Sequence, residues 1–266
     1  MDDPTRRDVV FGAAGAMAAR TLAGEALLTE RLPFDYAVDG VPFEGQLSVP
    51  RQRQAPMPAV LLCHEWSGLN DGMRQVADRV AGLGYACFAL DLYGKGVRGV
   101  ETGDNSHLMG PLMADRALLK SRLLGGLQAA SSRIEADASR MAAIGYCFGG
   151  LCALDLARAS PPSLRAAVSI HGTLQPTGLA TGPIRARVLL LHGWRDPVAG
   201  TTDDLVAIGR ELDRAGSDWQ LHVYGRAMHA FTAEGLNSPE RGLAYDPYAS
   251  ASSWEQMRSF LQETLQ

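Results

Sequence analysis

The 266-residue sequence predicts an α/β fold, in which a mostly parallel central sheet is covered by helices on both faces and carries an antiparallel N-terminal hairpin. Two observations lead to this prediction. Short continuous apolar runs are typical of strands buried on both faces, and they alternate with stretches of helical spacing. Because no linker, low-complexity tract or internal repeat interrupts them, we interpret residues 32–266 as one domain that follows an apolar segment, residues 1–31.

The hairpin is the first element expected in the domain. Residues 34–38 and 43–49 alternate apolar with polar side chains around Asp39 and Gly40, which are a strong turn signal. Residues 91–110 are rich in glycine and polar groups, and a loop of that length usually forms a lid or lines a binding site. The other elements are expected in this order: strand 58–64, helix 71–83, strand 85–90, helix 111–130, strand 141–144, a helix from residue 151, strands 166–170 and 187–192, helix 202–215, strand 219–224 and a closing helix from about residue 250.

The first 31 residues allow two interpretations. Arg6 and Arg7 have the form of a twin-arginine export motif, and the apolar run at residues 9–19 has the length of a signal core, which would give a periplasmic protein. However, Arg20 follows at once, and no small-x-small cleavage site stands where one is needed. We therefore favour an uncleaved helix in a cytoplasmic monomer or homodimer. The run is too short to span a bilayer.

Charge and cysteine content exclude several classes of protein. The net charge of −4, with acidic and basic residues interspersed, provides no basic stripe for nucleic acid. The spacing of the cysteines matches neither a zinc ribbon nor a secreted disulfide framework, so we expect free thiols in a reducing compartment. No pair of histidines has metal-ligand spacing, and we predict neither a metal nor another cofactor. The four cysteines are Cys63, Cys87, Cys147 and Cys152.

The stretch Gly-Tyr-Cys-Phe-Gly-Gly at residues 145–150 is the most informative motif. It joins an apolar run to a helical one, and Gly-x-nucleophile-x-Gly in that setting is the nucleophile elbow, where flanking glycines permit a sharp turn and the central side chain sits in strained backbone geometry. The N-terminus of the following helix favours a thiolate at Cys147 and an oxyanion beside it. The alternative is a buried core cysteine between glycines that only pack a strand against a helix.

A nucleophile at this turn needs a base, and the base needs an acid to orient it. With this topology the chain order is nucleophile, acid, histidine, each on a loop at the carboxyl end of a strand. Asp196 follows the strand 187–192, and His229 follows the strand that ends at Tyr224. The three placements test one another, so we predict a catalytic triad of Cys147, Asp196 and His229.

At these residues the chain resembles the dienelactone hydrolase family of the α/β-hydrolase fold. The resemblance covers roughly residues 34–264. The Cys-centred elbow together with the pair His64-Glu65 is its most specific part. The motifs that carry it are His-Glu-Trp-Ser-Gly-Leu-Asn at 64–70, Asp-Leu-Tyr at 91–93, the elbow at 145–150, Gly-Trp-Arg-Asp at 193–196 and His-Ala-Phe at 229–231.

The resemblance implies a role for each residue of the site. Cys147 would be the nucleophile, His229 the general base and later the acid, and Asp196 the group that orients the imidazole. Glu65 would be a buried carboxylate that contacts the resting thiol and swings away when substrate binds. The backbone amides of Trp66 and Phe148 would form the oxyanion hole. The Phe148 amide is also expected there on physical grounds, because the first amides of a helix have no intrahelical partner.

Substrate contacts are predicted from Tyr93, Lys95 and Trp194. The family is expected to hold a substrate carboxylate with two arginines, but this sequence has Lys95 and Ala233 at those positions. A lysine supplies a point charge without the bidentate fork of arginine. Unless Arg98 or Arg226 substitutes, a different small ester, lactone or thioester is at least as good a candidate as dienelactone.

The resemblance therefore implies a carboxylic ester hydrolase of carboxymethylenebutenolidase type, which cleaves a small ester or lactone through a Cys147 thioester. The predicted hydrolase needs only one partner, a small-molecule substrate. Two alternatives stay open: a thioesterase or peptidase that uses the same triad, and a non-enzymatic ligand-binding or redox-sensing protein in which Cys147 responds to oxidants.

Overall fold

The computed structural model describes residues 27–100, 103–179 and 182–266. The predicted N-terminal segment thus lies almost wholly outside the described residues, and its interpretation stays a prediction. Strand β1 begins at Thr29, three residues before the position at which the sequence placed the start of the domain. Within the described residues, no helix combines the length and apolarity needed to cross a membrane.

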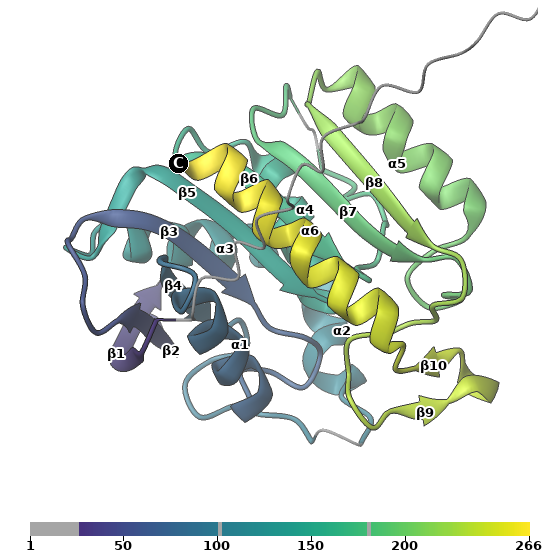
Figure 1. Cartoon of the computed structure of the whole chain (residues 1–266), viewed down its shortest axis with the longest axis horizontal. Helices are drawn as coiled ribbons and strands as arrows, with labels where there is room; N and C mark the ends of the chain where they lie inside the picture. The colour runs from purple at the N-terminus through teal and green to yellow at the C-terminus, as the bar shows by residue number, and fades with distance from the viewer. Residues whose placement is uncertain (1–26, 101–102, 180–181) are drawn as a thin grey trace, which may run out of the picture.

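An eight-stranded sheet forms the centre of the molecule, in the order β1-β2-β4-β3-β5-β6-β7-β8 (Figure 1). Strands β3 to β8 run parallel to one another, whereas β1 and β2 form an antiparallel hairpin at one edge, and β2 also pairs antiparallel with β4. This confirms the predicted mostly parallel sheet with its N-terminal hairpin. The strands are β1 Thr29–Val38, β2 Val41–Pro50, β3 Met57–Cys63, β4 Ala86–Leu90, β5 Ala136–Tyr146, β6 Leu164–Ile170, β7 Arg187–Gly193 and β8 Trp219–Tyr224.

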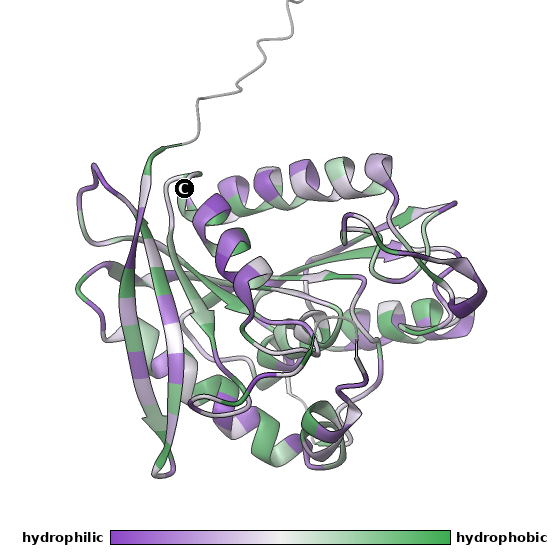
Figure 2. Cartoon of the chain, turned by 90° about the horizontal axis from the view of Figure 1, so that it is seen from below, coloured by the Kyte–Doolittle hydropathy of each residue, from purple (hydrophilic) through white to green (hydrophobic). Residues whose placement is uncertain are grey.

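Helices cover both faces of the sheet, as expected for strands without a polar face. Apolar side chains of α1 and α6 pack on one face, and those of α2 to α5 pack on the other. Figure 2 shows these layers on either side of the sheet, with hydrophilic and hydrophobic residues alternating along the helices. The helices are α1 Asp71–Ala81, α2 Ser106–Ala114, α3 Arg116–Ser131, α4 Phe148–Ala159, α5 Thr202–Arg214 and α6 Pro247–Leu265.

The structure differs from the sequence prediction between β4 and β5. A single helix was expected over residues 111–130, after a loop from 91 to 110. Instead α2 begins at Ser106, inside that loop, contains Pro111 and ends before Asp115. The carboxylate of Asp115 accepts a hydrogen bond from the amide of Leu118 at 2.9 Å and so caps the start of α3. The single-helix prediction was wrong because a capping aspartate begins a second helix.

Candidate active site

The turn between β5 and α4 has the strained geometry that the sequence predicts. Cys147 has φ 55° and ψ −118°, a backbone conformation rare for a residue with a Cβ. The residues two positions before and two positions after Cys147 are glycines for steric reasons. A Cβ on Gly145 would lie 2.0 Å from the carbonyl oxygen of Gly149, and one on Gly149 would lie 2.1 Å from that of Cys63. The tight contact of turn, helix and strand β3 therefore requires both glycines.

Three strand ends bring Cys147, His229 and Asp196 together. Nε2 of His229 lies 3.1 Å from Sγ of Cys147, and its Nδ1 lies 2.8 Å from Oδ2 of Asp196. The other oxygen of Asp196 accepts hydrogen bonds from the amides of Val198 and Ala199, at 2.9 and 2.8 Å. The three side chains thus form a hydrogen-bonded chain in which His229 lies between Cys147 and Asp196.

A short hairpin that the sequence did not predict holds His229 in place. Strands β9 (Asn237–Ser238) and β10 (Leu243–Ala244) pair beside the histidine. The amide of His229 donates to the carbonyl of Gly242 at 2.9 Å, and its own carbonyl accepts from Ala244 at 3.3 Å. Both the amide and the carbonyl of His229 therefore hydrogen-bond to this hairpin.

The electrostatics of the triad favour charge on the imidazole. Burial of His229 disfavours the imidazolium, but hydrogen bonds to Asp196 and Cys147 outweigh it and raise the pKa of His229 to about 10. Burial likewise opposes charge on Asp196, yet its hydrogen bond to His229 and its two amide donors keep the pKa of this carboxyl below its usual range. Asp196 is therefore a carboxylate at neutral pH and stabilises a proton on His229.

The carboxylate of Glu65 lies beside the loop that follows β3. It accepts hydrogen bonds from the Ser67 amide at 2.9 Å, from the Asn70 side chain at 2.9 Å and from the Ser67 hydroxyl. The hydrogen bond shown for the Cys147 sulfur is with His229. The predicted switching role of Glu65 stays a prediction.

Two backbone amides were predicted to bind the oxyanion. Phe148 is the first residue of α4, so its amide lies outside the ladder of intrahelical hydrogen bonds. The loop that carries Trp66 is held by the hydroxyl of Tyr93, which donates to the Trp66 carbonyl at 2.8 Å. The ring of Tyr93 stacks on that of Phe148 with centroids 6.1 Å apart, so Tyr93 contacts both predicted elements of the oxyanion hole.

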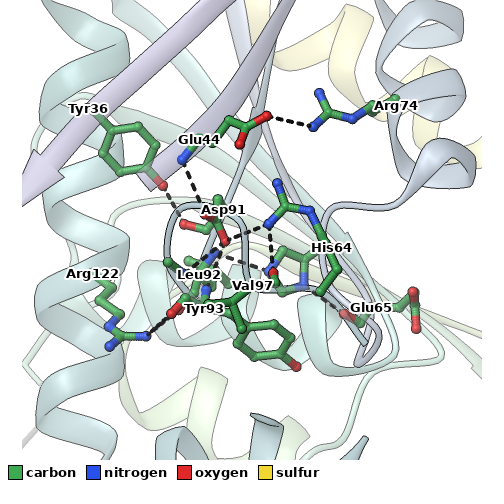
Figure 3. A network of polar contacts seen from close by, with 12 residues as sticks. Tyr36, Glu44, His64, Glu65, Arg74, Asp91, Leu92, Tyr93, Val97 and Arg122 are labelled. Carbon is green, nitrogen blue, oxygen red and sulfur yellow. Dashed lines mark hydrogen bonds and ion pairs between the residues drawn. The ribbon is translucent and has the colours of Figure 1, made fainter. Parts of the chain in front are cut away.

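A buried polar network around His64 and Asp91 links the loop after β3, which carries Glu65, to the loop after β4, which carries Tyr93 (Figure 3). Nε2 of His64 accepts a hydrogen bond from the Leu92 amide at 3.1 Å, and its Nδ1 lies 2.7 Å from the carbonyl oxygen of Glu65. Asp91 accepts from the amides of Tyr93 and Gly94, at 3.0 and 3.1 Å. His64 thus links the Glu65 loop to the Tyr93 loop.

Lys95 and Trp194 lie in settings that the sequence did not anticipate. The ammonium of Lys95 forms an exposed ion pair with Asp35 on β1, at 2.9 Å. Trp194 is 56% exposed and borders an apolar groove with Leu205 and Trp219, between α5 and β8. Their predicted contacts with substrate stay predictions, and the ion pair gives Lys95 a structural partner on the hairpin.

Two further residues lie at the triad. His171 follows β6 and hydrogen-bonds to the Cys147 amide and to the hydroxyl of Thr232. Thr232 was not predicted, because nothing in the residues around it marks a hydroxyl that contacts a strand end 61 residues away. Within the described residues, no group of three or more His, Cys, Asp or Glu side chains is arranged to hold a metal ion.

The parallel sheet with its sharp strand–turn–helix defines the α/β-hydrolase class. The model of the dienelactone hydrolase family matches residues 43–265, and the chain belongs to that family. Its fold and its hydrolase class are thereby established, as the resemblance implied.

Individual relatives agree with this assignment. A crystal structure described as a dienelactone hydrolase-like promiscuous phosphotriesterase from metagenomic libraries is 33% identical, with a TM-score of 0.83, and the match covers 90% of this chain and 100% of that one. A protein of Aquifex aeolicus named "Putative carboxymethylenebutenolidase" is 25% identical over 87% of this chain and 97% of its own length. An uncharacterised protein of Caenorhabditis elegans is 36% identical over 54% of this chain and 93% of its own. The chain is accordingly a carboxylic ester hydrolase.

Proposed function

We propose that this enzyme hydrolyses a small carboxylic ester or lactone through a thioester on Cys147. One observation carries the proposal: the sulfur lies 3.1 Å from Nε2 of His229, whose other nitrogen lies 2.8 Å from a carboxylate oxygen of Asp196. A nucleophile, a base within hydrogen-bond reach and a group that orients the base are what acyl transfer through a covalent intermediate requires.

The first half of the reaction forms the thioester. His229 accepts the thiol proton, and the thiolate attacks the carbonyl carbon of the substrate. The carbonyl oxygen becomes an oxyanion, which the amides of Trp66 and Phe148 stabilise. When the tetrahedral intermediate collapses, the C–O bond of the ester breaks and His229 gives its proton to the leaving alkoxide. The raised pKa of His229 supports this step, because it favours the imidazolium beside the thiolate.

The second half releases the acid. His229 takes a proton from a water molecule, whose oxygen attacks the thioester carbonyl. The C–S bond then breaks, the carboxylic acid leaves and the proton returns to the Cys147 sulfur. With a lactone the leaving alkoxide stays attached to the acyl group, so the single product is a hydroxy acid.

The experiment that tests the proposal is turnover of p-nitrophenyl acetate by the purified protein, before and after treatment with one equivalent of iodoacetamide. We expect the label on Cys147 by mass spectrometry and loss of turnover in proportion to labelling. The variants Cys147→Ala and His229→Ala should each lower kcat by about 10³-fold or more. Full turnover after complete labelling of Cys147 would contradict the thioester route, and absence of turnover despite rapid labelling would favour a redox-sensing thiol.

Phosphotriester cleavage is a second candidate activity. It is supported by the 33% identity to the promiscuous phosphotriesterase over that protein's whole length. A phosphotriester with a p-nitrophenolate leaving group releases the same chromophore as the ester, so one assay measures both. Loss of both activities in Cys147→Ala would indicate a shared nucleophile, whereas turnover of the ester alone would restrict the enzyme to carbonyl substrates.

A further inference from the structure

A second buried imidazole lies directly beside the triad. His171 follows β6 and has a positive φ of 40°. Its amide donates to the carbonyl of Leu191 on β7 at 2.8 Å, which anchors the backbone. Its ring is 3% exposed and meets the ring of His229 edge to face, with centroids 5.3 Å apart. The proposed reaction gives His171 no chemical step, so its position needs another explanation.

The hydrogen bonds of His171 define its tautomer. Nδ1 of His171 lies 3.2 Å from the backbone nitrogen of Cys147. The same backbone N–H also donates to the carbonyl of Ile170, at 3.0 Å. A backbone N–H can only donate, so Nδ1 must accept. Nδ1 is therefore unprotonated, and the ring proton lies on Nε2. That proton is donated to Oγ1 of Thr232, at 2.8 Å. The imidazole thus joins the nucleophile turn on one side to a threonine hydroxyl on the other.

A proton on Nδ1 would break this arrangement, because two N–H groups would then face each other. The surroundings disfavour such a proton. Burial, and after it the nearby His229, holds the pKa of His171 well below its usual value. His171 therefore stays neutral while the proposed reaction places a proton on His229.

Thr232 lies three residues after His229, in the same segment between β8 and α6. The hydrogen bond from His171 to Thr232 consequently restrains the segment that carries His229 relative to the Cys147 turn. We propose that His171 and Thr232 form a brace that sets the distance between the Cys147 sulfur and Nε2 of His229. His171 is then a positioning residue, and the effect of the brace on turnover rests on the proposed function.

The sharpest test is Thr232→Val, which removes the hydroxyl and keeps the shape of the side chain. If the brace positions His229, kcat for p-nitrophenyl acetate falls roughly 10- to 100-fold while KM stays unchanged, because small displacements of a catalytic group have effects of that size. Thr232→Ser restores the hydroxyl and should return kcat to near the wild-type value. A role in packing alone would make the serine variant at least as impaired as the valine variant.

The reactivity of Cys147 toward iodoacetamide provides a second readout, which needs no substrate. At pH 7 alkylation depends on thiolate formed with His229, so Thr232→Val should slow it by a similar factor. This readout separates the two proposals: failure of the wild type to hydrolyse esters would overturn the proposed function, while the alkylation rates would still test the brace.

Thr264→Val is the matched control. Thr264 is also half-buried, and its hydroxyl bonds to Phe260 and Arg187, at the opposite end of the sheet from the triad. It should leave both kcat and the alkylation rate unchanged. His171→Phe keeps a ring but removes both nitrogens, and combining it with Thr232→Val should cost no more than either change alone if the two residues act as one unit. Wild-type kcat and alkylation in Thr232→Val, or fully additive losses in the double variant, would overturn the brace.

Discussion

Asp196 is held on both of its carboxylate oxygens, and each contact has a separate role. Oδ2 accepts from His229 and orients the imidazole, whereas Oδ1 accepts from the amides of Val198 and Ala199 and fixes the carboxylate itself. Because the amides hold Oδ1, the side chain is positioned before substrate arrives. The preorganisation of the triad therefore begins in the backbone of the loop after β7.

Asp196→Asn tests this arrangement. The amide side chain keeps an oxygen for the two backbone donors but turns an NH₂ group toward His229, which then presents the wrong tautomer to the thiol. We expect kcat to fall about 10²- to 10⁴-fold with little change in melting temperature. Asp218→Asn is the control, since that carboxylate pairs with Arg187 on the surface. Unaltered kcat in Asp196→Asn would exclude Asp196 from the triad.

Single residues differ in how far the sequence could predict them. Cys147, Asp196 and His229 are marked by their strand-end positions and chain order, which local patterns reveal. The partners of Glu65 and Lys95 are not marked in this way. Which groups a flexible side chain meets depends on the packing of distant segments, such as β1 for Lys95. For the same reason the contact between His171 and Thr232 could not be foreseen.

At the scale of elements, the elbow is the most constrained part of the fold. Gly149→Ala would place a Cβ against the backbone of Cys63 on β3, where no side chain can move aside. We expect this change to lower the free energy of unfolding by more than about 2 kcal/mol and to abolish ester turnover. Urea denaturation followed by circular dichroism measures the first effect.

Gly110→Ala is the control for this prediction. Gly110 lies within α2, and a Cβ there has nothing within 4 Å. The change should alter the free energy of unfolding by less than about 1 kcal/mol, because the better helix propensity of alanine is opposed by the ring of the following Pro111, which disfavours a Cβ on the residue before it in a helix. Equal free energies of unfolding for the two variants would show that the turn and strand β3 lie farther apart in solution than in this structure.

The strands could be predicted better than the helices. Continuous apolar runs such as residues 58–64 are unambiguous because each lies in a sheet covered on both faces. The boundary between α2 and α3 depends on one polar side chain, that of Asp115. The spacing of apolar residues, from which the helix was predicted, contains no information about this cap. The hairpin of β9 and β10 is too short to produce any periodicity, yet it holds His229.

For the molecule as a whole, a buried ionic network links three helices on one face of the sheet. Asp155 on α4 accepts from Arg116 on α3 at 2.5 Å and from Arg158 at 3.1 Å, and Arg158 continues to Glu211 on α5 at 2.6 Å. Buried charges of this kind are tolerated only when each has its partner. The network therefore specifies how α3, α4 and α5 pack together.

Asp155→Ala should leave the Arg116 guanidinium buried without its carboxylate. We expect the free energy of unfolding to fall by about 3–5 kcal/mol, as measured by urea titration. Glu255→Ala, which removes an exposed partner of Arg258 on α6, should change it by less than about 1 kcal/mol. Similar small effects of the two variants would mean that water enters between the helices and screens the network.

The hydrogen bond between Cys147 and His229 joins residues 82 positions apart, and this spacing has a consequence for biosynthesis. The thiol leaves the ribosome before its base exists, and at roughly 5–20 residues per second the interval is about 4–16 s. During that time the nascent chain carries Cys147 without the imidazole of His229. Synthesis of the 82 residues from Cys147 to His229 thus delays activation of the nucleophile until β8 has joined the sheet.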